Sequence, residues 1–172
     1  MNIHLLKHAL LLIVCFSTIT AKAEHDRREV KVETAGTLST IITEGAKYKI
    51  TDLTITGELN GDDIRYLREM AGADFRGNTT QGQLSAIDLS NATIVEGGNY
   101  YYRDDKENYS THNNILPSFA QCKNLQEFKA PMSVYKHEQY AFYGCTELCE
   151  VTLPHSLDTG NYLSQAFYNC PK

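Results

Sequence analysis

The sequence reads Ala141-Phe-Tyr-Gly-Cys-Thr-Glu-Leu-Cys-Glu-Val-Thr-Leu-Pro-His-Ser-Leu157 in its second half, and this stretch is the clearest copy of a recurring pattern. The Phe-x-x-Cys part of the pattern also occurs at Phe119-Ala-Gln-Cys122 and at Phe167-Tyr-Asn-Cys170, at offsets of 23 and 25 residues. Periods of about 20–29 residues are typical of solenoids, in which each repeat stacks on the next. The recurrence therefore predicts stacked coils for this half of the chain.

Apolar residues with the spacing L-x-x-L-x-L follow the Phe-x-x-Cys units and also occur upstream of them. The four copies are Ile50-x-x-Leu53-x-Ile55, Leu84-x-x-Ile87-x-Leu89, Leu125-x-x-Phe128-x-Ala130 and Leu148-x-x-Val151-x-Leu153. We expect these residues to point inward from short strands that pair in parallel, about 4.8 Å apart. The three phenylalanines of the Phe-x-x-Cys units should close the interior from the other side of each coil.

These motifs resemble the repeats of the BspA-like leucine-rich repeat surface proteins of Bacteroidetes, whose units follow A-F-x-x-C-x-x-L-x-x-V-x-L-P-x-S-V. The segments Ile50–Asn60 and Ile87–Ile94 are similar to the part that precedes the repeats in those proteins. The resemblance implies an α/β solenoid, a leucine-rich repeat fold with short parallel strands and an N-terminal capping region. The chain departs from the pattern at Ser118 and Ala130, and its end at Lys172 predicts an array truncated at the C-terminus.

Three regions are predicted along the chain. Residues 1–23 form a signal peptide, residues 24–83 an N-terminal cap with one irregular strand–helix unit, and residues 84–172 the leucine-rich repeat region with an insertion loop at 96–114. The insertion is too long for a simple turn.

Two elements are expected inside the predicted cap. Asp62–Ala71 should be a helix, because Asn60 offers a capping oxygen and apolar residues recur at three-residue steps, with Arg65, Arg68 and Glu69 on the other side. Lys47–Thr56 alternates as a half-buried strand does.

The first residues have the features of a secretory signal. A basic residue, Lys7, precedes the apolar run Ala9–Phe16, and Ala21-Lys-Ala23 offers a small-x-small cleavage site. The chain is therefore expected to be exported, at the cell surface or secreted. Cys15 leaves open a lipoprotein alternative, for which Val14 is a poor preceding residue.

The charge balance argues against nucleic acid as a partner. The net charge is −5 and becomes −7 when residues 1–23 are removed, since they contain two lysines and no acid. Phosphate binding needs a basic surface. No later segment has the roughly 20 apolar residues that a transmembrane helix requires.

Residues that flank the inward strand positions should form two columns on the outer face of the sheet, a surface that repeat proteins commonly use for binding. The first column is Asp52, Ala86, Glu127 and Glu150, and the second is Thr54, Asp88, Lys129 and Thr152. Stacked carboxylates repel one another, so a cationic or hydrogen-bonding partner would stabilise the first column. The alternative is a solvated face without a ligand.

Three consecutive tyrosines, Tyr100, Tyr101 and Tyr102, stand in the insertion. Exposed tyrosines suit recognition of proteins or carbohydrates, because the ring is apolar and the hydroxyl is polar. Alternatively, one or two of the rings pack against the solenoid and anchor the insertion.

No residue pattern indicates catalysis or a cofactor. The histidines are scattered in polar surroundings, and the spacings of Cys122, Cys145, Cys149 and Cys170 match no metal motif. Three of these cysteines occupy equivalent repeat positions, where they could form a buried column or, in an exported chain, disulfides.

The resemblance implies a non-enzymatic, adhesin-like module that binds a host or bacterial surface protein or glycan. The alternative is a truncated structural remnant of a longer repeat protein, with no ligand of its own. The shortened array also predicts an open apolar edge near Val151, Leu153 and Phe167, through which the protein could self-associate.

Overall fold

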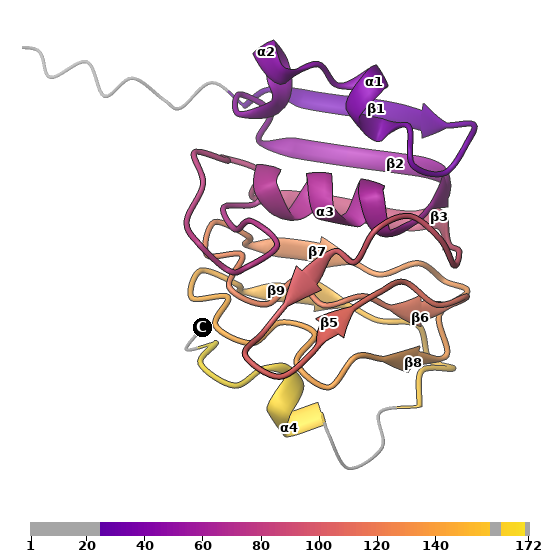
Figure 1. Ribbon diagram of the computed structural model, residues 1–172, viewed down its shortest axis with the longest axis vertical. Helices are drawn as coiled ribbons and strands as arrows, with labels where there is room; N and C mark the ends of the chain where they lie inside the picture. Colours follow the sequence, from indigo (N-terminus) through magenta and orange to yellow (C-terminus); the bar gives the residue numbers. More distant parts are fainter. Residues whose placement is uncertain (1–24, 159–162, 171–172) are drawn as a thin grey trace, which may run out of the picture.

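The computed structural model describes residues 25–158 and 163–170, so the predicted signal and Cys15 lie outside the described residues. Five parallel strands form an open sheet in the order β1-β2-β3-β7-β9, stacked along the long axis of the molecule (Figure 1). Their bounds are β1 Arg27–Val32, β2 Asp52–Leu59, β3 Ala86–Ile94, β7 Glu127–Lys129 and β9 Glu150–Thr152. An open, mostly parallel sheet is compatible with the predicted solenoid.

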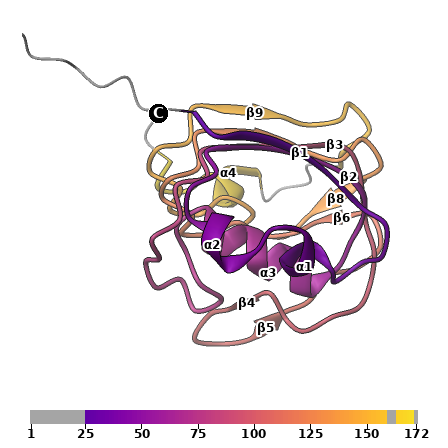
Figure 2. The same ribbon diagram turned by 90° about the horizontal axis from the view of Figure 1, so that it is seen from above.

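The other elements occupy the remaining sides of the coil. They are the helices α1 Leu38–Ile41, α2 Glu44–Lys47, α3 Gly61–Met70 and α4 Leu163–Ala166, the parallel pair β6 Ile115–Leu116 and β8 Lys136–His137, and the antiparallel hairpin β4 Tyr102–Arg103 with β5 Asn108–Tyr109. Seen along the stack, the sheet forms one side of the molecule and the β4–β5 hairpin lies on the opposite side (Figure 2). The insertion predicted as a loop therefore contains a small hairpin.

The predicted inward row of the sheet is in register. Leu53 pairs with Ile87, Ile87 with Phe128 and Phe128 with Val151. The first three are buried and Val151 is half-buried. The L-x-x-L-x-L motif placed these residues on one level of successive coils although the coils differ in length, because each copy of the motif marks the strand with which its coil returns to the sheet.

A column of phenylalanines lies across from this row, as predicted. The ring centroids of Phe119 and Phe142 are 6.5 Å apart, and those of Phe142 and Phe167 are 5.3 Å apart, with nearly parallel planes in both pairs. Phe128 from the sheet packs between the first two, at 4.9 and 5.1 Å. The Phe-x-x-Cys units therefore line a shared interior.

The turns of the Phe-x-x-Cys units are joined by backbone hydrogen bonds from one coil to the next. Phe119 N–H donates to Ala141 O at 2.6 Å, and Phe142 N–H donates to Ala166 O at 2.8 Å. Two residues further along, Gln121 N–H donates to Tyr143 O at 2.7 Å. The residue before each cysteine has a positive φ, which glycine adopts without strain, and the three such residues are Gln121, Gly144 and Asn169.

The repeat cysteines form a column, one of the two expected arrangements, in which Cys122 and Cys145 are buried and Cys170 is half-buried. Cys145 Sγ donates to Phe119 O at 3.2 Å, and Cys170 Sγ donates to Phe142 O at 3.0 Å. All four cysteines of the described residues are free thiols, so the disulfide alternative does not apply to them, and Cys149 is exposed. Burial raises the pKa of the Cys122 thiol to about 11, which keeps it protonated at neutral pH.

The predicted helix in the cap region is confirmed as α3. Asn60 Oδ1 accepts from Asp62 N–H at 3.0 Å, while Asp63 Oδ2 accepts from Asn60 N–H at 3.0 Å, which is a capping box. Asp63 is itself buried, and its Oδ1 accepts from Leu38 N–H at 2.9 Å. This carboxylate therefore holds the start of α1 against the start of α3.

Two predictions for this region were wrong in part. The predicted strand Lys47–Thr56 begins and ends later, as β2, because Lys47 ends α2, where its ammonium pairs with Glu69 at 2.6 Å. Arg68 does not lie on an outer face of α3, since its side chain is fully buried. The three-residue apolar step describes one face of α3, but neighbouring loops cover the other face as well.

Arg68 fills a specific place at the first Phe-x-x-Cys turn. Its Nη1 donates to Ser118 O at 2.8 Å, and its Nη2 donates to Ala120 O at 2.9 Å. In the next coil, the equivalent carbonyls of Ala141 and Tyr143 accept from backbone N–H groups. The guanidinium thus supplies the donors that a preceding turn supplies elsewhere.

Candidate functional site

The outward face of the parallel sheet carries a shallow hollow of about 210 Å³, which we call the sheet groove. It crosses the strands from β1 to β7. Its lining residues are Arg27, Glu29, Asp52, Leu53, Thr54, Ala86, Ile87, Asp88, Glu127 and Lys129.

The structure brings together the two predicted outward columns. The Cα partners of the first are Asp52, Ala86, Glu127 and Glu150, and those of the second are Thr54, Asp88, Lys129 and Thr152. Glu150 and Thr152 lie on β9, beyond the groove lining but in the same columns, and both are exposed. The positions of these residues follow from the repeat spacing, because parallel strands without a shift keep equivalent residues side by side.

The N-terminal end of the first column is neutralised within the chain. Asp52 Oδ2 lies 2.9 Å from His25 Nδ1 and its Oδ1 lies 3.6 Å from Arg27 Nη2. Partial burial acts to raise the pKa of Asp52, but hydrogen bonds from Thr51 and His25 outweigh it, so the pKa is below its ordinary value. Asp52 is therefore an ionised and already satisfied carboxylate.

The second column contains an ion pair between strands. Lys129 Nζ lies 3.0 Å from Asp88 Oδ2, and the Ser90 hydroxyl donates to Asp88 Oδ1 at 2.6 Å. By contrast, Glu127 and Glu150 are exposed neighbours, and neither forms an ion pair with a residue that the structure describes. The carboxylates of this face that form no ion pair with a described residue are thus Glu29 on β1 and the adjacent Glu127 and Glu150 on β7 and β9.

The sequence pattern did not indicate that β1 contributes to this face. Arg27 pairs with Asp52 and Glu29 pairs with Thr54, so β1 extends both columns by one coil. The alternation of charged and apolar residues in Arg27–Val32 is the signal that could have placed them.

The three tyrosines of the insertion do not form one exposed cluster. Tyr101 is fully buried and its hydroxyl accepts from Ser118 N–H at 3.1 Å, while Tyr102 is nearly buried with its ring 4.4 Å from the Arg68 guanidinium. Tyr100 remains half-buried against Phe75, at 5.7 Å between ring centroids. Two of the rings therefore anchor the insertion, which was the second expected interpretation.

Within residues 25–158 and 163–170, no group of three or more His, Cys, Asp or Glu side chains is placed to hold a metal ion. In the same part of the chain, no helix is long and apolar enough to cross a membrane.

The open, mostly parallel sheet, the repeated turns and the stacked interior are compatible with a leucine-rich repeat solenoid. Comparison with protein families specifies the type, since residues 116–172 match the model described as "BspA type Leucine rich repeat region (6 copies)". The match confirms the resemblance seen in the Phe-x-x-Cys repeats. A comparison with curated proteins found no match.

Proposed function

We propose that the protein is an exported, non-enzymatic, adhesin-like module that binds a surface protein of a host or of another bacterium through the sheet groove. Repeat regions of the leucine-rich type suggest protein interaction. The observation that carries the proposal is the hollow on the outward face, lined by residues from both columns. Concave or hollowed faces built from successive repeats are the surfaces on which such proteins bind.

The charges of the groove indicate the kind of partner. Asp52 and Asp88 are paired within the chain, whereas Glu127 and Glu150 stand next to each other and form no ion pair with a described residue. A basic or hydrogen-bonding patch on the partner would relieve their repulsion. The partner surface is therefore proposed to carry lysine or arginine residues opposite β7 and β9.

The N-terminal region has a separate proposed role, as a cap of the repeat array. The support is the Arg68 guanidinium, which donates to the two carbonyls of the first Phe-x-x-Cys turn. A first coil without such donors would leave buried carbonyls unsatisfied.

Binding can be tested by biolayer interferometry with immobilised matrix proteins and bacterial surface proteins. Glu127→Lys and Glu150→Lys should each weaken binding about tenfold or more, since each places a cation opposite a basic partner. Glu96→Lys is the matched control, because it makes the same charge change on an exposed residue outside the groove.

Two results would contradict the proposal. The first is that the protein binds no member of the panel, which favours the ligand-free remnant. The second is that it binds one member and that both groove variants bind this member as well as the wild type does. Circular dichroism of each variant would show that a loss of binding is not a loss of fold.

Self-association through the β9 edge also stays a prediction. Val151, Leu153 and Phe167 are half-buried there, and Tyr168 is 61% exposed. Sedimentation velocity over a hundredfold concentration range should reveal dimers if apolar contact at this edge is sufficient, and Tyr168→Ser should reduce them.

A further inference from the structure

Residues of the β4–β5 hairpin line a second recess. The hairpin lies on the side of the molecule opposite the sheet (Figure 2). The recess consists of two adjoining hollows, of about 640 and 410 Å³, which share Tyr102 and Asp104 in their lining. We call the two together the hairpin trough. Ligand pockets of small molecules typically measure about 300–1,000 Å³, so each hollow is large enough for a sugar residue or more.

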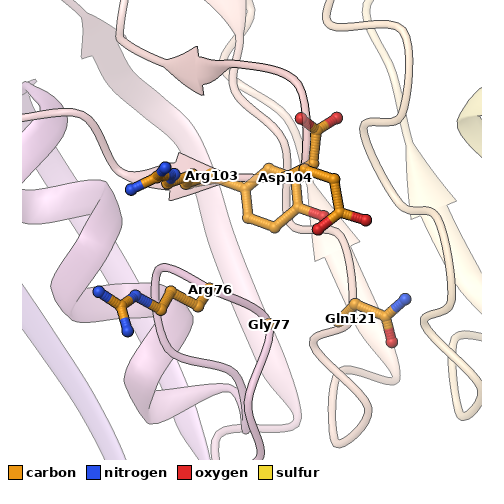
Figure 3. A pocket seen from close by; sticks show the side chains of 7 residues that line it. Arg76, Gly77, Arg103, Asp104 and Gln121 are labelled. Atoms are coloured by element: carbon orange, nitrogen blue, oxygen red, sulfur yellow. The ribbon is translucent and has the colours of Figure 1, made fainter.

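One end of the trough, in the larger hollow, carries two arginines beside the carboxylates of Asp104 and Asp105. Arg103 N–H donates to Phe75 O at 2.7 Å, which places Arg103 beside Arg76, the residue that follows Phe75. Both arginines line the larger hollow and extend in the same direction, away from Asp104 and Gln121 (Figure 3). Both are exposed, and neither forms an ion pair with any residue in the described part of the chain. Two unpaired guanidiniums in one hollow favour an anionic group.

The other end is aromatic and held in place by ring contacts. Tyr143 and Tyr140 line the smaller hollow together with Tyr109. The Tyr143 ring stacks on Tyr168, with centroids 5.9 Å apart and planes 3° apart, and meets Tyr140 edge-on at 5.9 Å. A half-buried tyrosine fixed on two sides is a preorganised apolar surface with a polar tip.

Polar groups lie between these two ends. Asp104 accepts from the backbone N–H groups of Lys106 and Glu107, both at 2.8 Å, and from the Tyr109 hydroxyl at 3.1 Å, so its position is fixed. Glu107 and Gln139 are exposed at the rim. Carboxylate, amide and hydroxyl groups in this mixture can accept from and donate to several hydroxyls of one ligand.

We propose that the hairpin trough binds an oligosaccharide that carries a carboxylate group. The C–H face of a sugar ring would pack on Tyr143, its hydroxyls would bond to Glu107 and Gln139, and its carboxylate would pair with Arg76 and Arg103. Guanidiniums bind carboxylates through two parallel hydrogen bonds, which selects an acidic sugar over a neutral one.

The alternative occupant is a cationic peptide, since tyrosines and carboxylates also attract ammonium groups. The smaller hollow alone would suit it. In the larger hollow, a cation that extended past the carboxylates of Asp104 and Asp105 would meet the guanidiniums of Arg76 and Arg103, which would repel it. The two hollows share a wall at Tyr102 and Asp104, and their combined chemistry favours the acidic sugar.

The test uses the purified protein and isothermal titration with 3′-sialyllactose, trigalacturonate, lactose and trilysine. At least one acidic sugar should bind at least tenfold more tightly than lactose. The double change Arg76→Ala and Arg103→Ala should remove this preference. Tyr143→Ala should weaken acidic sugar binding about tenfold, and the repeat tolerates alanine there because Ala120 occupies the equivalent position in the preceding coil.

A matched control tests whether binding depends on the trough. Tyr135→Ala removes a 47% exposed tyrosine outside the trough and should leave sugar binding unchanged. The proposal is overturned if neither acidic sugar binds, if both trough variants bind as the wild type does, or if trilysine binds in preference. Because the sheet groove is tested with different variants and ligands, either site can fail without the other.

Discussion

The first Phe-x-x-Cys turn and the second one have the same backbone course but receive their hydrogen bonds from different sources. At the second turn, the carbonyls of Ala141 and Tyr143 accept from backbone N–H groups of the preceding coil. At the first turn, the carbonyls of Ser118 and Ala120 accept from the Arg68 guanidinium instead. One guanidinium thus replaces two backbone N–H donors.

The difference shows how a regular array can follow an irregular region. Inside the array each coil satisfies the next, so a repeated spacing is sufficient. At its beginning, a buried carbonyl needs a donor from a segment that does not share the repeat. A planar guanidinium with donors at fixed separation can bridge two carbonyls at once. Arg68 has no carboxylate partner among the described residues, and the carbonyls and the Tyr102 ring compensate its charge.

The largest expected effect comes from breaking the array itself. Phe142→Ala removes a fully buried ring that contacts Phe119, Phe128 and Phe167, and should lower the free energy of unfolding by about 3–5 kcal/mol. Urea denaturation measures the change. Met132→Ala, at a 60% exposed residue, should stay within about 0.5 kcal/mol of the wild type. Equal stability of Phe142→Ala and wild type would place Phe142 outside the core.

The next effect tests the donor at the first turn. Arg68→Met keeps the length of the side chain but leaves the Ser118 and Ala120 carbonyls without donors, which should cost about 2–4 kcal/mol after the relief of a buried charge. The free energy of unfolding of Arg68→Lys, which has one ammonium for two carbonyls, should lie between those of the wild type and Arg68→Met. Hydrogen exchange should increase at residues 119 and 121 first. A fully stable Arg68→Met variant would mean that these carbonyls do not depend on the guanidinium.

A smaller effect is expected from the turn conformation that the coils share. Gly144 has φ +71°, and an added Cβ would lie 2.9 Å from the Gln121 side-chain amide, which can move aside. Gly144→Ala should therefore cost about 1 kcal/mol, chiefly from the backbone. Gln121→Gly, at a residue with φ +64°, should change stability by no more than about 0.5 kcal/mol. Thermal melts of both variants check whether the two turns are equivalent.

The smallest effect concerns the ion pair that joins β3 to the first repeat strand. Partial burial acts to raise the pKa of Asp88, but hydrogen bonds from Ser90 and Lys129 outweigh it and lower the pKa below its ordinary value. The resulting stability is present above the unfolded-state pKa, about 3.9, and is lost as the pH falls through the folded pKa. The melting temperatures of wild type and Asp88→Asn should therefore differ slightly at pH 7 and converge toward pH 3. A constant difference would show that the carboxylate charge is not responsible.

Much of the array could be read from the sequence because its contacts repeat. The spacing of Phe119, Phe142 and Phe167 predicted their stacking, and the strand motif predicted the outward columns residue by residue. The same spacing said nothing of Arg68, whose partners lie 50 and 52 residues away in a different kind of element. Arg68 was expected on the polar side of the helix, because helical periodicity identifies the apolar face. The periodicity does not show which segments cover the opposite face.

The candidate sites divide in the same way. The sheet groove follows from the register of equivalent residues, which sequence spacing fixes. The hairpin trough depends on where the insertion folds back, since the bond from Arg103 N–H to Phe75 O brings the hairpin beside the loop that carries Arg76.

The sequence by itself determined the stacked coils, the phenylalanine column and the residues of the outer sheet face, because a recurring motif marks the equivalent positions of successive coils. Only the tertiary structure decided that Arg68 is buried, that Tyr101 and Tyr102 anchor the insertion, and that arginines and tyrosines meet along the hairpin. Those outcomes depend on contacts between segments with no common spacing, and such contacts leave no periodic signal in a sequence.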